Sequence, residues 1–274
     1  MRAVDIKIMR AVDIIRGDSP IILAMPHSGL YVPEPIYARF NDVGRELSDT
    51  DWHIDQLYSD LLPNVTMVRA NFHRYVIDAN RPPSGQSLYP GQNTTGLCPL
   101  TDFDGADIYK KGQAPEPDEI ETRRKIFHAP YHEALPTEIA RVKNMHGMAL
   151  LYDCHSIRSH APYLFKGALP DFNIGTNSGK SCAPSLQKTV SEICKLAENY
   201  SSVENGRFKG GWTTRHYGRP ETGIHAIQME LAQVNYMQEC APWNYNHSDA
   251  QTLRSVLKKI LQSLEIRILK GDAS

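Results

Sequence analysis

Short apolar runs alternate along this chain with longer segments of helical periodicity, and this alternation constrains the fold more than any other feature. The apolar runs have the length and β-branched content of strands. They span residues 21–25, 65–70, 75–78, 149–153, 212–216 and 224–230. The helical segments begin near Asp51 and continue over residues 117–145, 184–198 and 249–269. Strands and helices in alternation predict an α/β fold with a mixed, mostly parallel sheet flanked by helices.

Prolines and loop residues divide this pattern further. Pro130 and Pro136 fall inside the segment 117–145 and predict that its helix bends or divides. Ser248 or Asp249 is the expected N-cap of the last helix. Residues 82–117 are rich in Pro, Gly, Thr and Asp and lack periodicity. Such a long irregular segment is typical of a functional loop, so we expect it to cover an active site.

The composition favours one domain that binds a small molecule. The 274 residues are 41% hydrophobic, enough to fill the core of one large domain, so we expect a single domain over 1–274. Thirty basic and 31 acidic residues leave a net charge of −1, which argues against a nucleic acid or an anionic membrane as partner. No apolar run approaches the roughly 20 residues that span a bilayer. We therefore expect a soluble protein with a small-molecule substrate.

The cysteines and the start of the chain add two further expectations. The five cysteines include no Cys-x-x-Cys pair, which argues against a disulfide framework and a thiolate zinc site and favours a reduced, cytoplasmic setting. Residues 1–6 recur as residues 9–14. We treat 1–16 as a variable N-terminal segment and give the repeat no functional weight.

Two strands end close to a histidine, His27 and His155. The carboxyl ends of neighbouring parallel strands meet at one crevice, so these imidazoles are expected to converge. Either one alone is more often a hydrogen-bonded structural residue. Asp51 and Asp55, four apart at a helix start, are candidates for a carboxylate ligand, although they also suit ordinary N-terminal charge. Two histidines, a carboxylate and water form the open arrangement of catalytic zinc.

Other polar residues suit catalysis and substrate binding. Glu230 lies in an apolar strand, where an unpaired carboxylate is costly to bury; beside a metal it suits a general base, and on an edge strand it would face solvent. Asn80 and Arg81 end another apolar run, and a guanidinium there suits capture of a carboxylate or a surface ion pair. Residues 207–220 gather arginines and a lysine around Gly210 and Gly211, as in an anion site or a solvated turn.

Seven motifs, taken in order, resemble the N-formylglutamate amidohydrolase family. They lie at residues 26–29, 51–58, 75–81, 88–99, 153–158, 205–220 and 228–236. The resemblance covers about residues 20–237 and implies a phosphorylase/hydrolase-like α/β fold, related to zinc carboxypeptidases and aspartoacylases. It further implies one zinc ion and the release of formate and L-glutamate from N-formyl-L-glutamate in histidine degradation.

The resemblance also implies roles for individual residues. It makes His27, Asp51 and His155 the zinc ligands, with Asp55 as the rival carboxylate, and Glu230 the general base. The Asn80–Arg81 pair is similar to the pair with which zinc carboxypeptidases hold a substrate carboxylate. Three further arginines are candidates for the second carboxylate: Arg158, Arg215 and Arg219.

Three other functions compete with this prediction. The first is hydrolysis of another N-acyl amino acid by the same fold, as in aspartoacylases. The second is a cysteine hydrolase that uses Cys154, which neighbouring positions on a strand argue against because Cys154 and His155 would point to opposite faces. The third is a protein that binds a metal or an anion without catalysis.

Overall fold

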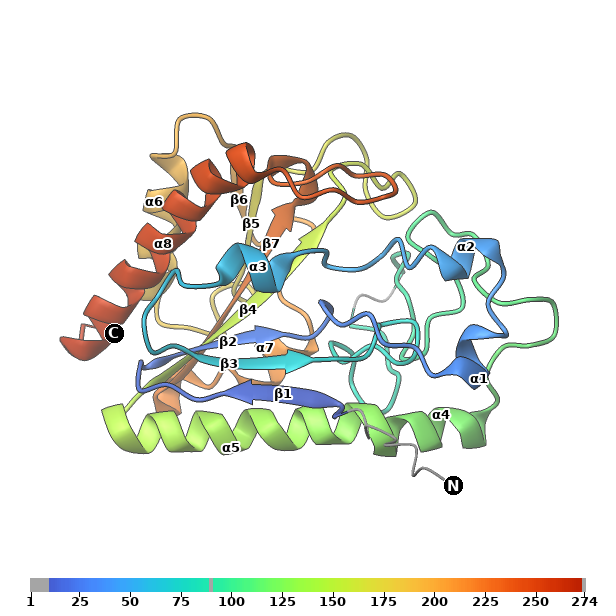
Figure 1. Cartoon of the computed structure of the whole chain (residues 1–274). Helices are drawn as coiled ribbons and strands as arrows, with labels where there is room; N and C mark the ends of the chain where they lie inside the picture. Colours follow the sequence, from blue (N-terminus) through green and yellow to red (C-terminus); the bar gives the residue numbers. More distant parts are fainter. Residues whose placement is uncertain (1–9, 89–90, 273–274) are drawn as a thin grey trace, which may run out of the picture.

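The computed structural model describes residues 10–88 and 91–272 and has one seven-stranded sheet at its centre (Figure 1). The strand order is β1-β3-β2-β4-β7-β5-β6. β1 runs antiparallel to β3 and β5 antiparallel to β7, and the other neighbours are parallel. The strands are β1 Val12–Ile15, β2 Ile21–Met25, β3 Thr66–Ala70, β4 Ala149–Ile157, β5 Phe172–Gly175, β6 Ser202–Glu204 and β7 Ile224–Ala232. The predicted mixed, mostly parallel α/β sheet is confirmed.

Helices cover both faces of this sheet. They are α1 Glu34–Tyr37, α2 Asp42–Arg45, α3 Ile54–Tyr58, α4 Pro117–Arg123, the π-helix η1 Arg124–His128, α5 Ala129–His146, α6 Pro184–Lys195, α7 Trp212–Tyr217, the 3-10 turns η2 Pro220–Thr222 and η3 Gln233–Asn235, and α8 His247–Leu269. Figure 1 shows α5 running along one side of the sheet, whereas α6 and α8 pair on the other. Both faces of β2 and β4 are therefore buried, which explains their continuous apolar runs.

The two faces of β4 belong to different clusters. Leu150, Tyr152 and Cys154 pack into the core shared with α6 and α8, whereas Ala149 and Leu151 pack into the core on the α5 side. This alternation follows from the two-residue period of a strand. It places the next residues of the α5-side row, Asp153 and His155, at the carboxyl end of the strand on that same face.

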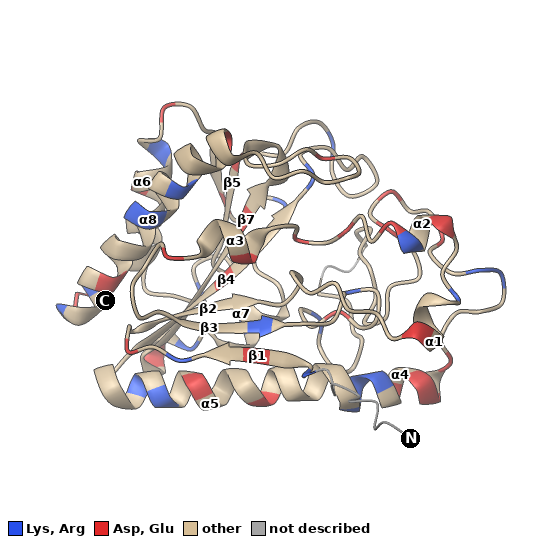
Figure 2. Ribbon diagram, viewed as in Figure 1, with Lys and Arg blue, Asp and Glu red and all other residues tan. Residues whose placement is uncertain are grey.

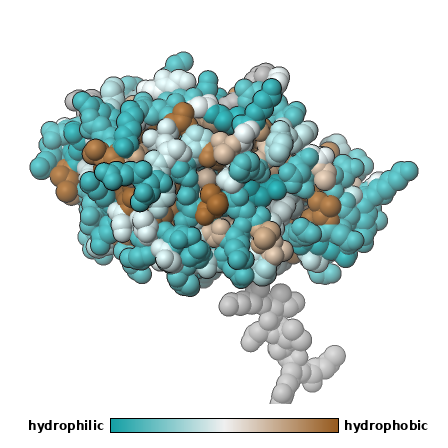
Figure 3. Space-filling view, turned by 90° about the horizontal axis from the view of Figure 1, so that it is seen from above, coloured by the Kyte–Doolittle hydropathy of each residue, from teal (hydrophilic) through white to brown (hydrophobic). Residues whose placement is uncertain are grey.

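The outer surface is polar and mixed in charge. Both α5 and α8 carry basic and acidic side chains (Figure 2), and the face in Figure 3 shows only scattered hydrophobic spots among hydrophilic side chains. Within the described part of the chain, no helix is long and apolar enough to cross a membrane.

Two predicted strands are wrong, and both lie beside the site described below. Residues 75–78 form turns: Tyr75, Val76 and Ile77 are fully buried in the core, so their apolar character reflects burial rather than strand pairing. Residues 212–216 lie in helix α7, whose first backbone N–H groups, on Trp212 and Thr213, donate to the backbone and side chain of Asn80. This contact with a distant residue overrides the strand propensity of the segment.

The segment around the two prolines differs from the prediction. Helix runs without a break from residue 117 to 146, and the irregularity is the π-helix η1, two residues before Pro130. Pro130 is the second residue of α5 and Pro136 lies inside it, and neither proline ends the helix. The N-cap of α8 is Asn246, whose side chain accepts from the N–H groups of Ser248 and Asp249.

The short elements β1, β5, β6, α1 and α2 had no counterpart in the predicted pattern, because three or four residues carry little periodicity. The first copy of the N-terminal repeat, residues 1–6, lies outside the described residues, and most of the second copy forms β1 and the residues before it.

Candidate active site

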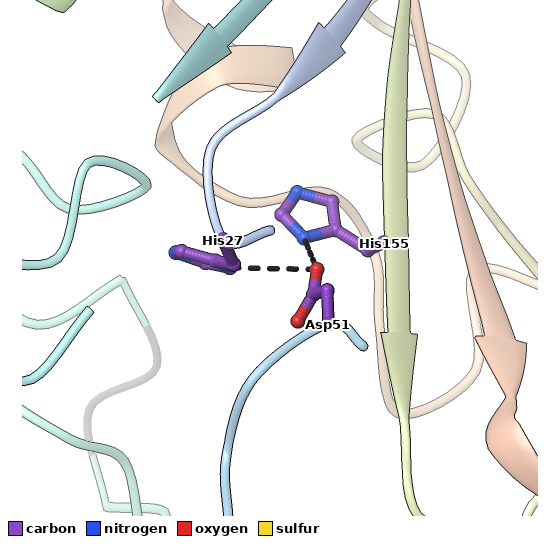
Figure 4. Close-up of side chains that lie close together, drawn as sticks. All are labelled: His27, Asp51 and His155. Atoms are coloured by element: carbon purple, nitrogen blue, oxygen red, sulfur yellow. Dashed lines mark hydrogen bonds and ion pairs between the residues drawn. The ribbon is translucent and has the colours of Figure 1, made fainter. Parts of the chain in front are cut away.

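Three predicted ligands meet at the carboxyl ends of the central strands (Figure 4). His27 follows β2 by two residues, His155 lies near the end of β4, and Asp51 comes from the loop before α3. The backbone N–H of Asp51 donates to the carbonyl of His27 at 3.1 Å, which fixes that loop against the strand end. One donor atom from each of the three buried side chains lies within 4.8 Å of the others.

Both imidazoles turn the same nitrogen toward Asp51. The distance to Asp51 Oδ2 is 3.0 Å from Nδ1 of His155 and 3.7 Å from Nδ1 of His27. The opposite nitrogens face further carboxylates: Nε2 of His27 lies 2.7 Å from Asp78, and Nε2 of His155 lies 3.1 Å from Asp153. A carboxylate behind each imidazole fixes the ring and strengthens the facing nitrogen as a ligand, as in many metal sites.

The residues present fit a zinc ion. Nδ1 of His27 and Oδ1 of Asp51 are buried without a hydrogen-bond partner among the described residues, which is costly unless something else occupies the space between them. Two imidazoles and one carboxylate are a typical three-ligand set for catalytic zinc. Burial alone would raise the pKa of Asp51, but the hydrogen bond from His155 and the charge of the nearby His27 outweigh it and hold that pKa well below its usual range. The carboxylate is therefore ionised, as a ligand must be.

Two polar residues close to Asp51 in the sequence, His53 and Asp55, lie outside the His–Asp–His group. Asp55 is partly exposed and pairs with Arg69 at 2.5 Å. The ring of His53 contacts the carbonyl of Trp243 at 2.6 Å. Of the two aspartates that the spacing left open, only Asp51 lies with the histidines.

Glu230 lies beside the three ligands. It is directly opposite His155 in the parallel register of β4 and β7, and only 6% of its surface is exposed. Burial raises its pKa to about 7, because the nearby His155 only partly offsets the loss of solvation. Gln228, two residues earlier on the same face, donates to the Glu230 carboxylate at 2.9 Å and accepts from the N–H of Gly211 at 2.7 Å. Gln228 thus holds Glu230 in place, and the pKa of about 7 means that this carboxyl group titrates near neutral pH.

A pocket of about 590 Å³, including its open mouth, joins Glu230 to the histidines. Its lining residues are His27, Arg74, Asn80, Arg81, Asn93, Thr94, Thr95, Phe103, His155, Ile157, Leu164, Arg207, Phe208, Gly211, Gln228 and Glu230. Four of them, Asn93, Thr94, Thr95 and Phe103, come from the long irregular segment 82–117.

Three arginines, Arg74, Arg81 and Arg207, contribute positive charge to this pocket, and we call them the arginine wall. Arg74 pairs with Asp78 at 2.8 Å. Arg81 donates from Nε and Nη2 to the backbone and hydroxyl of Thr95 at 2.9 and 3.0 Å.

Arg207 donates to the carbonyls of Leu164 and Asn93, both at 3.0 Å. The pocket therefore combines the guanidinium groups of the arginine wall with the Glu230 carboxylate and the two histidines.

Asn80 contacts both His155 and the helix α7. Its Nδ2 lies 3.0 Å from Nε2 of His155, and its Oδ1 accepts from the N–H of Thr213. The α7 segment approaches so closely that a Cβ at Gly211 would lie 2.3 Å from the Asn80 amide. Glycine is required there because the Asn80 side chain occupies the space that a Cβ would need.

The other predicted arginines do not line this pocket. Arg158 pairs with Asp104 at 3.0 Å, Arg215 donates to the carbonyl of Gly210, and Arg219 donates to the carbonyl of Gly218. The arginine-rich motif 205–220 was noticed in the sequence, but spacing alone did not distinguish its first arginine, Arg207, from the later ones. Arg74 directly precedes the motif 75–81 and Gln228 opens the motif 228–236, yet the sequence did not single out either residue.

Cys154 faces away from the site. It is fully buried in the core on the α6 and α8 side, on the opposite face of β4 from Asp153 and His155, and burial raises its thiol pKa well above the usual range. A protonated thiol without access to the pocket is a poor nucleophile.

An open α/β sheet with a His–Asp–His group and a buried glutamate at the carboxyl ends of its strands is typical of metal-dependent hydrolases. The model of the N-formylglutamate amidohydrolase family matches residues 19–237. The chain belongs to this family. The family assignment from the sequence motifs is thereby confirmed.

Two relatives resemble most of the chain. An N-formylglutamate deformylase of Pseudomonas aeruginosa is 47% identical over 251 residues, which are 91% of this chain and 94% of that protein. An N-formylglutamate deformylase of Pseudomonas putida is 46% identical over 252 residues, 91% of this chain and 93% of that protein.

Two solved structures share the fold. The crystal structure of N-formylglutamate amidohydrolase from Ralstonia eutropha has a TM-score of 0.80 at 23% identity and covers 96% of this chain and 100% of that one. A protein from Agrobacterium tumefaciens has a TM-score of 0.70 at 17% identity, covering 93% and 95% of the two chains. At these identities the likeness concerns the fold.

Proposed function

We propose that this protein hydrolyses N-formyl-L-glutamate to formate and L-glutamate with a zinc ion held by His27, Asp51 and His155. The observation that carries this proposal is that the two histidines of this group, the buried Glu230 and the arginine wall line one pocket, with Asp51 beside the histidines. A metal site and a base suit amide hydrolysis, and guanidinium groups suit a dicarboxylate substrate. The names of the two Pseudomonas relatives support the same substrate.

Glu230 carries the proton transfers. When bound, zinc supplies a Lewis acid that polarises the formyl carbonyl and acidifies water. Glu230 in its ionised form accepts a proton from the attacking water as the oxygen bonds to the formyl carbon. It then donates that proton to the amide nitrogen as the C–N bond breaks, which releases formate and the free amine. A pKa of about 7 suits both directions of transfer.

The arginine wall holds the substrate and stabilises charge. Asn80 and Arg81 bind one carboxylate of the glutamyl part, and Arg207 binds the second. Arg158, Arg215 and Arg219 were predicted for the second carboxylate, but their position outside the pocket makes Arg207 the better candidate. Arg74 lies 3.8 Å from Asp51, near enough to stabilise negative charge that develops on the formyl oxygen.

Formate release tests this proposal directly. The zinc-loaded protein is incubated with N-formyl-L-glutamate, with and without a chelator, and formate is measured. We expect release that the chelator abolishes and added zinc restores. N-acetyl-L-glutamate distinguishes the runner-up: faster cleavage of the acetyl substrate would indicate an aspartoacylase-like deacylase. Binding of N-formyl-L-glutamate without any cleavage would indicate a binding protein instead.

The physiological setting belongs to the same proposal. The family resemblance suggests a role in histidine degradation, and five cysteines without a paired motif suggest a reducing, cytoplasmic compartment. The expected partner is the small-molecule substrate.

A further inference from the structure

Two histidines outside the pocket contact the back of the turn that carries Asn80 and Arg81. His128 ends the π-helix η1 and His132 lies one turn later in α5, with ring centroids 4.3 Å apart. Nε2 of His132 lies 2.8 Å from the carbonyl of Ala79, and Nε2 of His128 lies 2.9 Å from the carbonyl of Arg81. Neither histidine lines the pocket that holds the three ligands.

The hydrogen bonds fix the protonation state of His132. A carbonyl only accepts, so Nε2 must carry the proton and donate it. Nδ1 lies 2.9 Å from the hydroxyl of Tyr217, which donates to it if the ring is neutral. Burial and the neighbouring His128 lower the pKa of His132 to about 3, so the ring is neutral at working pH.

His128 is held in the same way. Its Nε2 also faces a carbonyl and therefore donates. Burial lowers its pKa as well, which keeps the second ring neutral. The π-helix sets the position of His128, because one wide turn shifts the residues after it around the helix, and such turns are frequent at functional sites.

Every carbonyl of the turn is thus held from outside. His132 and His128 donate to the carbonyls of Ala79 and Arg81, and the carbonyl between them, on Asn80, accepts from the backbone N–H of Trp212 at 3.4 Å. With its backbone fixed on this side, the turn presents the Asn80 and Arg81 side chains to the pocket.

We propose that His128 and His132 are positioning residues for substrate binding: as neutral donors they orient the Ala79–Arg81 backbone so that Asn80 and Arg81 meet a substrate carboxylate. This inference rests on the proposed function. A merely structural role would lower the stability of the protein when either histidine is replaced. The positioning role instead predicts that substrate affinity depends on the Nε2 donor of each ring.

Paired substitutions test the donor itself. Glutamine places its amide nitrogen near the position of Nε2, whereas the shorter asparagine reaches only the position of Nδ1. We expect His132→Asn and His128→Asn to raise KM about tenfold with kcat within about threefold of wild type, since each loses a buried hydrogen bond that orients the site. His132→Gln and His128→Gln should keep KM within about threefold.

Two more variants complete the experiment. Tyr217→Phe removes the hydroxyl that contacts Nδ1 and should raise KM about two- to threefold. His216→Asn is the control: this exposed ring stacks on Trp212 at 4.4 Å and forms no hydrogen bond with the described residues. It should leave KM unchanged. Zinc content, Tm and calorimetric binding of L-glutamate are measured for every variant, and L-glutamate affinity should fall in parallel with the rise in KM.

Each outcome decides the inference. An unchanged KM in both asparagine variants overturns the inference. It is also overturned if the glutamine variants raise KM as much as the asparagine variants do. A fall in kcat and zinc content without a change in KM overturns it as well. If an asparagine variant has a strongly lowered Tm, the KM of the glutamine variant at the same position is used to test the inference instead. If the wild-type protein releases no formate from N-formyl-L-glutamate, the proposed function fails, and the positioning role falls with it. If the wild-type protein is active and the asparagine substitutions leave KM unchanged, only the positioning role fails.

Discussion

The metal site and the arginine wall lie in one pocket but are built in different ways. His155 and Glu230 are held opposite each other by the parallel register of β4 and β7, and His27 follows directly from β2. Arg81 and Arg207 are held by loop contacts, to Thr95 and to the carbonyls of two loop residues. A site on strand ends is rigid, whereas a site on loops has more freedom. We therefore expect changes in the first to abolish activity and changes in the second to weaken substrate binding by degrees.

The largest effect is expected from the loss of a metal ligand. Asp51→Ala should lower both zinc content and formate release to background, because two imidazoles alone hold zinc weakly. Asp55→Ala is the matched control, four residues later and paired with Arg69 at the surface. It should retain both. Metal analysis and a formate assay on the two variants give the comparison, and the reverse result would make Asp55 the ligand.

Glu230→Gln should be almost as damaging while leaving the metal in place. The amide keeps the size of the side chain but cannot accept the proton, so kcat should fall about 10²- to 10⁴-fold. Zinc content should equal that of wild type, since Glu230 is not one of the three ligands. Near-normal turnover in this variant would contradict the assignment of Glu230 as the base.

At the arginine wall we expect a graded loss of affinity. Arg207→Ala should raise KM about 10- to 100-fold, with a smaller effect on kcat. This is the loss of affinity expected when a hydrogen bond to a charged group is removed. Arg219→Ala is the control, because its exposed side chain bonds only local carbonyls among the described residues. Steady-state kinetics of both variants separates them. A larger effect at Arg219 would instead indicate that Arg219, one of the three candidates from the family resemblance, binds the second carboxylate of the substrate.

The same contrast explains what the sequence could predict. β2, β4 and β7 are buried apolar runs, so their positions were evident, and the convergence of His27 and His155 followed from the rule that strand ends meet. Spacing left Asp51 and Asp55 both open, and the family resemblance favoured Asp51. The contact between the N–H of Asp51 and the carbonyl of His27 explains why Asp51 lies with the histidines.

The loop-built part was harder to predict because its conformation depends on distant residues. Residues 212–216 form a helix whose first N–H groups bond to Asn80, 133 positions away from Thr213, and no local pattern signals that contact. Residues 75–78 are apolar because they are buried, not because they pair as a strand. The choice among the arginines of 207–219 likewise depends on where the backbone turns.

A smaller effect is expected from pH. Burial raises the pKa of Glu230 to about 7, and a base acts only when ionised, so activity should be lost as pH falls through that value. One unit below the pKa about a tenth of the carboxylate remains ionised. A bound cation favours the carboxylate, which places the midpoint at or below about 7. The pH profile of kcat/KM, with zinc content checked at each pH, measures it, and an acid limb above pH 8 would contradict the assignment.

The smallest effect is expected at Cys154, which is adjacent to His155 in sequence but on the opposite face of β4. Cys154→Ala should keep kcat/KM within about threefold, because the thiol contacts only the core and removing one sulfur leaves a small cavity. Cys194→Ala is the matched control, a fully buried cysteine of the same core. A loss above about 100-fold in Cys154→Ala alone, with zinc retained, would mean that a strand neighbour reaches the pocket and would revive a cysteine mechanism. Equal, small changes in both variants would instead show that β4 separates the core on one face from the chemistry on the other.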